Sequence, residues 1–132
     1  MIYKNAKIGD KITDIAVKDR KIVSLEKTSD DGIDLGGNRI FPGLIDIDAH
    51  GCMGLETNSG EIEKLSCYEA AHGTTSWLPT TATVDFEITK TALDRDIKTI
   101  KGANVLGFHI EGPYISESRK GAQDRNTYEN PI

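Results

Sequence analysis

The chain has 132 residues, a net charge of -5 and 37% hydrophobic residues, which suits ordinary folded structure with a modest core. The acidic balance disfavours broad binding to nucleic acid or to an anionic membrane, and we expect neither as a partner. The two cysteines lack metal-pair spacing, and no stretch has the length and apolarity of a signal peptide or a membrane span, so we expect a cytoplasmic protein with reduced thiols.

The first 41 residues predict a small β module. Residues 2–8, 13–18 and 21–25 have the composition of short strands, and the pair Asp19-Arg20 suits a tight hairpin. Pro42-Gly43 then interrupts the strand pattern. We therefore predict a domain boundary at this point, with residues 1–41 as the β module and residues 42–132 as the main domain.

The main domain opens on residues 42–51, Pro-Gly-Leu-Ile-Asp-Ile-Asp-Ala-His-Gly. Read as a strand, the segment has one apolar face, which we expect to be buried under helices, and an opposite face that ends in Asp48 and His50. Parallel α/β sheets carry their chemistry at the carboxyl ends of the strands. The two side chains are spaced so that both can reach one metal ion, although His50 can equally be hydrogen-bonded to backbone.

A glycine-rich loop, residues 51–60, follows this strand and leads to a predicted helix. Asn58 and Glu61 have the spacing of a capping box at the start of that helix. Gly73 is a natural stop at its end. The apolar side of the helix is expected to include Ile62, Leu65, Tyr68 and Ala71.

Residues 74–81 predict a second strand because they are rich in β-branched side chains. Asp85 is suited to cap a second helix that closes at Gly102. The apolar stripe expected for this helix comprises Phe86, Leu93, Ile97 and Ile100.

Residues 105–111 predict a third strand, and His109 and Glu111 stand at the end of one of its faces, as Asp48 and His50 do in the first. Alternating strands and helices indicate a parallel sheet with its chemistry at the carboxyl ends. Three such strands leave an open sheet edge. We therefore expect the chain to be the N-terminal part of a longer α/β barrel, with more strands after residue 132.

Two motifs carry a family resemblance. Residues 42–51, preceded by a β module, resemble the first barrel strand of the amidohydrolase superfamily. Residues 107–115, Gly-Phe-His-Ile-Glu-Gly-Pro-Tyr-Ile, and then Lys-Gly-Ala-Gln at 120–123, are similar to N-acetylglucosamine-6-phosphate deacetylases. This resemblance implies the N-terminal part of a (β/α)8 TIM-like metallo-hydrolase barrel, preceded by a small β-sandwich module and truncated after the third barrel strand.

The resemblance also implies a reaction, the metal-dependent hydrolysis of N-acetylglucosamine 6-phosphate to glucosamine 6-phosphate and acetate in amino-sugar catabolism. It makes Glu111 a ligand of a divalent metal ion, with zinc favoured and iron or another divalent ion as alternatives. Two histidine ligands and an acid/base aspartate are expected beyond Ile132, so the chain alone is expected to be inactive. The first histidine of the superfamily pattern is Asp48 here, a position at which the deacetylase family varies.

Other roles remain open at this point. His50 and Asp48 are candidates for further metal contacts, and His109 is a candidate for orienting Glu111, with a structural ion pair or a hydrogen-bonded histidine as the ordinary alternative. The resemblance favours sugar contacts, rather than a solvated turn, for Gly121, Ala122 and Gln123. It also implies a homodimer for the full-length protein. The competing functions are another amidohydrolase, such as a cyclic amidase, and a non-catalytic sugar-binding or assembly module.

Overall fold

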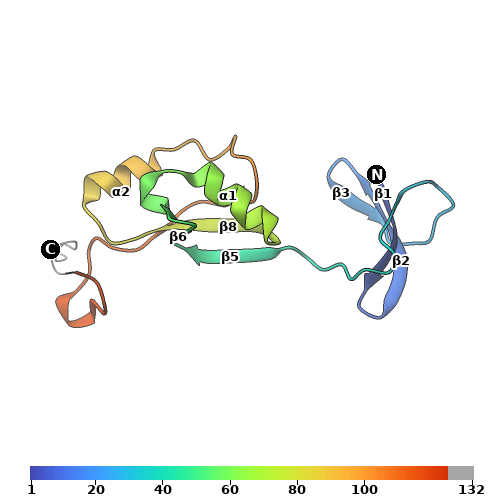
Figure 1. Cartoon of the computed structure of the whole chain (residues 1–132), viewed down its shortest axis with the longest axis horizontal. Coiled ribbons are helices and arrows are strands. Elements are labelled where there is room, and N and C mark those ends of the chain that lie inside the picture. The colour runs from blue at the N-terminus through green and yellow to red at the C-terminus, as the bar shows by residue number, and fades with distance from the viewer. Residues whose placement is uncertain (125–132) are drawn as a thin grey trace. The chain divides into compact units, whose positions relative to one another are not determined.

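A computed structural model describes residues 1–124, and residues 125–132 of the predicted main domain lie outside this part (Figure 1). The chain divides into two compact units between Pro42 and Gly43. None of the helices formed by residues 1–124 combines the length and apolarity needed to cross a bilayer.

The first unit contains a four-stranded sheet in the order β3-β2-β1-β4. Its strands are β1 (Ile2–Ile8), β2 (Lys11–Lys18), β3 (Lys21–Ser24) and the two-residue β4 (Ile33–Asp34). The first three pair antiparallel, as their predicted ranges and the hairpin require, whereas β4 joins β1 in parallel. Asp19 and Arg20 turn the β2–β3 hairpin with φ values of 50° and 62°, which are the positive angles of a type I′ turn.

A buried carboxylate ties a loop to this sheet. The Asp14 side chain in β2 is 1% exposed and accepts hydrogen bonds from the backbone N–H groups of Thr28 at 3.0 Å and Asn5 at 2.9 Å. The Lys27 ammonium lies 3.0 Å from the same carboxylate. These interactions, with the Thr28 bond as the largest, lower the pKa of Asp14 from 3.8 to about 2.

The second unit is organised around β8 (Thr74–Thr81), the central strand of a parallel sheet. One neighbour is β5 (Leu44–Ala49), and the other side carries β9 (Asn104–Val105) and β10 (His109–Ile110). All three pairings with β8 are parallel, so the predicted parallel order is confirmed. The third strand is not continuous as predicted. The Leu106 N–H still bonds the Trp77 carbonyl of β8 at 3.0 Å, and the chain then leaves the sheet until His109, with Gly107 at a φ of 155° in this break.

The core of this unit lies between β8 and α1 (Ile62–Ala71), which runs along that strand in Figure 1. Trp77 of β8 is fully buried against Ile62 and Leu65 of the helix. Its indole Nε1–H donates to the hydroxyl of the buried Ser66 at 3.0 Å. The packed helix and strand therefore provide a rigid base for the strand ends.

The predicted capping box at α1 is wrong. The Asn58 side chain makes no bond to the helix and instead bonds both backbone groups of Ala82, while Glu61 pairs with Lys64. Asn58 lies in a short 3-10 helix, η1 (Thr57–Ser59), which is followed by Gly60 in a left-handed conformation. This extra turn separates Asn58 from the true start of the helix.

The predicted cap of α2 (Phe86–Leu93) is confirmed, since the Asp85 carboxylate accepts from the Glu87 N–H at 2.8 Å. The predicted apolar stripe is wrong, because the helix stops at Leu93 and buries Thr89 and Ala92 instead of Phe86. The remaining residues of the expected stripe lie beyond the helix and pack against the core as part of a loop: Ile97 and Ile100.

The apolar face of β5 is less covered than expected. Ala49 packs against the core, but Ile45 and Ile47 are 64% and 65% exposed. The reason is that α1 packs on β8, and no helix formed by residues 43–124 covers β5.

Candidate functional site

Four ionisable side chains meet at the carboxyl ends of β5 and β10. Asp48 and His50 come from the end of β5, and His109 and Glu111 come from β10 and the residue after it. His50 Nε2 lies 3.1 Å from Glu111 Oε2, and His109 Nδ1 lies 3.4 Å from Asp48 Oδ1. The structure therefore brings together the metal-site candidates Glu111, His50 and Asp48 with His109, and we call these four residues the strand-end cluster.

Glu111 is the most firmly held member of the strand-end cluster. One carboxylate oxygen faces His50, and the other accepts a hydrogen bond from the Gln123 side-chain amide. Its side chain is 35% exposed, compared with 61% for Asp48, so it is less open to solvent but still accessible to a ligand. A carboxylate held on two sides in this way is preorganised to bind a cation or a polar group.

The loop that carries Gln123 is closed by its own backbone. The Gln123 N–H donates to the Lys120 carbonyl at 3.1 Å, and the Lys120 ammonium donates to the Gln123 carbonyl at 3.0 Å. Gly121 and Ala122 between them are exposed. Of the predicted sugar contacts, Gln123 thus reaches the strand-end cluster, while Gly121 and Ala122 form the outer turn of the loop.

Two threonines at the end of β8 contact members of the strand-end cluster. The sequence motifs did not identify them as site residues. The Thr80 hydroxyl lies 3.3 Å from His109 Nδ1, and the Thr81 hydroxyl accepts from the Glu111 N–H at 3.3 Å. Both threonines are fully buried. The sequence feature that could have identified them is the run Pro-Thr-Thr-Ala-Thr at 79–83, because hydroxyl groups buried at a strand end need polar partners.

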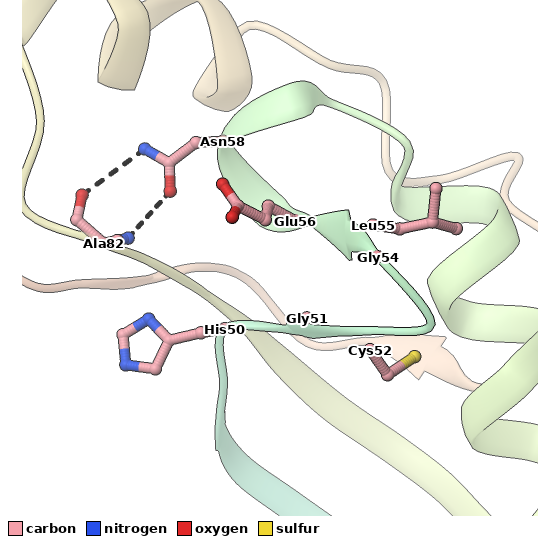
Figure 2. Close-up of a pocket in the computed structure, with 8 residues that line it drawn as sticks. All are labelled: His50, Gly51, Cys52, Gly54, Leu55, Glu56, Asn58 and Ala82. Carbon is pink, nitrogen blue, oxygen red and sulfur yellow. Dashed lines mark hydrogen bonds between the residues drawn. The ribbon is translucent and has the colours of Figure 1, made fainter.

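A cavity of about 340 Å³ adjoins the cluster through His50, and Figure 2 shows its lining. Its wall is a hairpin of β6 (Gly51–Cys52) and β7 (Leu55–Glu56), which lies within the predicted glycine-rich loop. Asn58 closes one end through its two bonds to Ala82, at 2.7 Å to the N–H and 3.3 Å to the carbonyl. The cavity is therefore built on fixed backbone.

Cys52 lies in the same lining but has the properties of a packing residue. Its side chain packs against the core between α1 and β8. Burial raises the pKa of the Cys52 thiol, and the charge of Glu69 raises it further. A thiol held protonated in this way is a poor nucleophile and a poor metal ligand.

The donor types of the strand-end cluster fit a divalent metal ion only in part. Carboxylate oxygen and imidazole nitrogen are ligands that zinc accepts, and a catalytic zinc takes about three protein ligands. His50 Nε2 lies 3.6 Å from Asp48 Oδ1 as well as 3.1 Å from Glu111 Oε2. Among residues 1–124, however, no group of three or more histidine, cysteine, aspartate or glutamate side chains has an arrangement that could hold a metal ion. A complete metal centre would therefore need ligands in addition to His50 and Glu111.

Curated proteins match most of the chain. It is 33% identical over 130 residues to the N-acetylglucosamine-6-phosphate deacetylase of Lysinibacillus sphaericus, a match that covers 90% of this chain and 34% of that protein. It is 36% identical over 90 residues to the N-acetylgalactosamine-6-phosphate deacetylase of Escherichia coli, which covers 63% of this chain and 24% of that protein. No model of a known protein family matches.

A solved structure of a protein with the same name as the first of these relatives is similar to this chain. The crystal structure of N-acetylglucosamine-6-phosphate deacetylase from Thermotoga maritima superposes with a TM-score of 0.79 at 29% identity, and the match covers 100% of this chain and 38% of that one. The chain spans from a quarter to about a third of the length of the curated relatives it matches.

Proposed function

Because the chain is a homologue of N-acetylglucosamine-6-phosphate deacetylases, we propose that it forms part of a metal-dependent enzyme that hydrolyses N-acetylglucosamine 6-phosphate to glucosamine 6-phosphate and acetate. The similarity to these deacetylases extends over nearly the whole chain, the length that includes residues 42–51 and 107–115, and this supports the proposal. The observation that carries the proposed reaction is the strand-end cluster, in which Glu111 is held between His50 and Gln123.

In the proposed architecture, residues 1–41 supply strands of a small β-sandwich, and residues 42–132 supply the first three βα units of a (β/α)8 barrel. The parallel pairing of β5, β8 and β10 in chain order supports a barrel, because consecutive barrel strands are neighbours. The half-exposed apolar face of β5 supports it as well, since further barrel elements would cover it.

Glu111 and His50 are the residues that we propose to hold a divalent metal ion, together with ligands outside residues 1–124. Asp48 is a further candidate, and zinc is the favoured ion, with iron as the main alternative. When bound, such an ion polarises an amide carbonyl and lowers the pKa of a bound water molecule. The His109 ring nitrogen faces Asp48, so we propose that His109 orients Asp48 rather than Glu111, the residue expected from the sequence. The Thr80 hydroxyl holds the His109 imidazole, and the Thr81 hydroxyl holds the Glu111 backbone.

The acetamide of the sugar is proposed to lie over the face of Glu111 that is open to solvent. Gln123, whose amide already binds Glu111, stands at the edge of this position with Gly121 and Ala122 beside it. Backbone and amide groups of this loop then meet the polar edge of the sugar. We further propose a cytoplasmic protein that forms a homodimer at full length.

The test is acetate release from N-acetylglucosamine 6-phosphate by the complete protein that contains this chain. We expect turnover, and we expect metal analysis to find a divalent ion that is lost in Glu111→Ala and kept in Glu63→Ala, a change on the exposed side of α1. Hydrolysis of a cyclic amide without sugar turnover would favour another amidohydrolase. Sugar binding without any hydrolysis or metal would favour the non-catalytic module.

A further inference from the structure

We propose that Glu56 binds a hydroxyl group of the amino sugar, on a ring carbon next to the one that bears the acetamide. This inference rests on the proposed function and adds a sugar contact to it. Glu56 belongs to neither of the two motifs on which the family resemblance is based, and it lines one cavity together with His50.

The backbone of the β6–β7 hairpin fixes the place of Glu56. Gly51 pairs with Glu56, and the next backbone bond runs from the Thr57 N–H to the His50 carbonyl at 2.9 Å. A Cβ atom on Gly51 would lie only 2.1 Å from the Leu55 carbonyl oxygen, and Gly51 has a φ of 152°. Only glycine allows the two backbones to approach this closely, so Glu56 is held beside His50.

The direction of the Glu56 side chain follows from the alternation of side chains along a strand. Leu55 packs into the core, so Glu56 points to the opposite side. In Figure 2 the carboxylate of Glu56 and the imidazole of His50 both point to the left of the view, away from Leu55 and Cys52. One cavity is thus lined by a member of the strand-end cluster and by a second acid.

The Glu56 carboxylate is also available to a ligand. Within residues 1–124 it accepts no hydrogen bond and forms no ion pair, whereas the nearby Asn58 amide is fully engaged with Ala82. The cavity volume of about 340 Å³ lies in the range of small-molecule sites. Free carboxylate oxygens in such a site accept strong hydrogen bonds from hydroxyl groups.

The position of the acetamide determines which sugar hydroxyl lies near Glu56. If the acetamide lies at Glu111 and His50, the ring carbon that bears it is close to His50, and its two neighbours in the ring are C1 and C3. Glu56 pairs with Gly51, the residue directly after His50, and lines the same cavity as His50. The hydroxyl on C1 or C3 is therefore the group that Glu56 meets.

The experiment compares kcat/KM for acetate release by the complete protein with N-acetylglucosamine 6-phosphate and with its 1-deoxy and 3-deoxy forms. We expect Glu56→Ala to lower kcat/KM for the parent sugar by about 10- to 100-fold, the loss of a hydrogen bond to a charged group. For one deoxy sugar the same substitution is expected to have no effect. Glu63→Ala is the control, and Glu56→Gln is a variant of unchanged shape that is expected to show a smaller loss.

Two results would overturn the inference alone: a parent-sugar kcat/KM in both Glu56 variants equal to that of Glu63→Ala, or an equal loss with all three sugars. Absence of acetate release by the wild-type protein would instead overturn the proposed function, and this inference with it.

Discussion

At the scale of single residues, Asp14 shows how a buried carboxylate is stabilised as an anion. Two backbone N–H groups and Lys27 surround it, and its pKa falls to about 2 from an ordinary value of 3.8. A carboxyl with a lowered folded-state pKa stabilises the fold above its unfolded pKa, and this contribution is lost as the pH falls through the folded value. The pH range in which stability declines is therefore about 4 down to about 2.

We predict that Asp14→Asn lowers the urea midpoint of the chain at pH 7, because the neutral amide cannot accept both backbone bonds and pair with Lys27. The difference from wild type should shrink as the pH approaches about 2, where wild-type Asp14 is itself becoming protonated. Asp31→Asn, an exposed change in the same unit, is the control. A difference that stays constant from neutral pH to about pH 2 would contradict this explanation.

The residues of the site were predictable to different degrees. Asp48, His50, His109 and Glu111 could be identified from the sequence because strand alternation and the carboxyl-end rule place them together. Thr80, Thr81 and Glu56 could not, since their contacts depend on the register between β8 and β10 and on a hairpin formed inside an apparent loop. Asn58 was misassigned because its capping-box spacing gave no sign of its bonds to Ala82.

At the scale of elements, the contact between α1 and β8 is the main support of the site. Ser66 and Trp77 are both buried and hydrogen-bonded to each other at 3.0 Å. Removing one partner leaves a buried polar group without a bond, which costs more than removing both.

We predict that Ser66→Ala destabilises the chain by about 1–3 kcal/mol, because the Trp77 N–H loses its partner. The measurement is a double-mutant cycle of Ser66→Ala and Trp77→Phe by urea unfolding. The double variant should lose less stability than the sum of the two single variants. Strict additivity would show that the hydrogen bond contributes nothing.

The start of α2 gives a second prediction for an element. Asp85→Ala should destabilise the chain by about 1 kcal/mol, because the helix loses the acceptor for the Glu87 N–H. Asp85→Asn retains a capping oxygen and should remain close to wild type in the same thermal unfolding experiment. If the alanine and asparagine variants were equally stable, the cap would have no role.

Some limits of strands and helices were predictable from local composition, and others were not. The limits of β8 and the cap at Asp85 follow from local composition, as the structure confirms. The end of α2 at Leu93 does not, because Ile97 and Ile100 continue the apolar pattern but are partly buried against the core as part of a loop. The break between β9 and β10 likewise occurs inside an alternating sequence, at Gly107.

At the scale of the whole molecule, the open edge of the sheet is the main feature. Ile45 and Ile47 on β5 are more than half exposed, although they form the apolar face of a strand. An uncovered apolar strand at a sheet edge favours pairing with another chain. The proposed barrel would remove this edge.

We predict that the isolated 132-residue chain self-associates and binds a hydrophobic dye, and that Ile45→Glu combined with Ile47→Lys reduces both. Sedimentation velocity and dye fluorescence provide the measurements. Glu63→Ala is the matched surface control. A monomeric wild-type chain that binds no dye would contradict the prediction that the apolar face of β5 must be covered by further structure.

The central claim is that the strand-end cluster, with Glu111 at its centre, is the deacetylation site. Its most direct test is the rate of acetate release from N-acetylglucosamine 6-phosphate by the complete protein, with Glu111→Gln and Glu63→Gln compared. We predict turnover by the wild-type protein and by Glu63→Gln, and a loss of about 100- to 1000-fold in kcat for Glu111→Gln, the size expected when one electrostatic group of a site is removed. A Glu111→Gln variant as fast as the wild-type protein would contradict the claim.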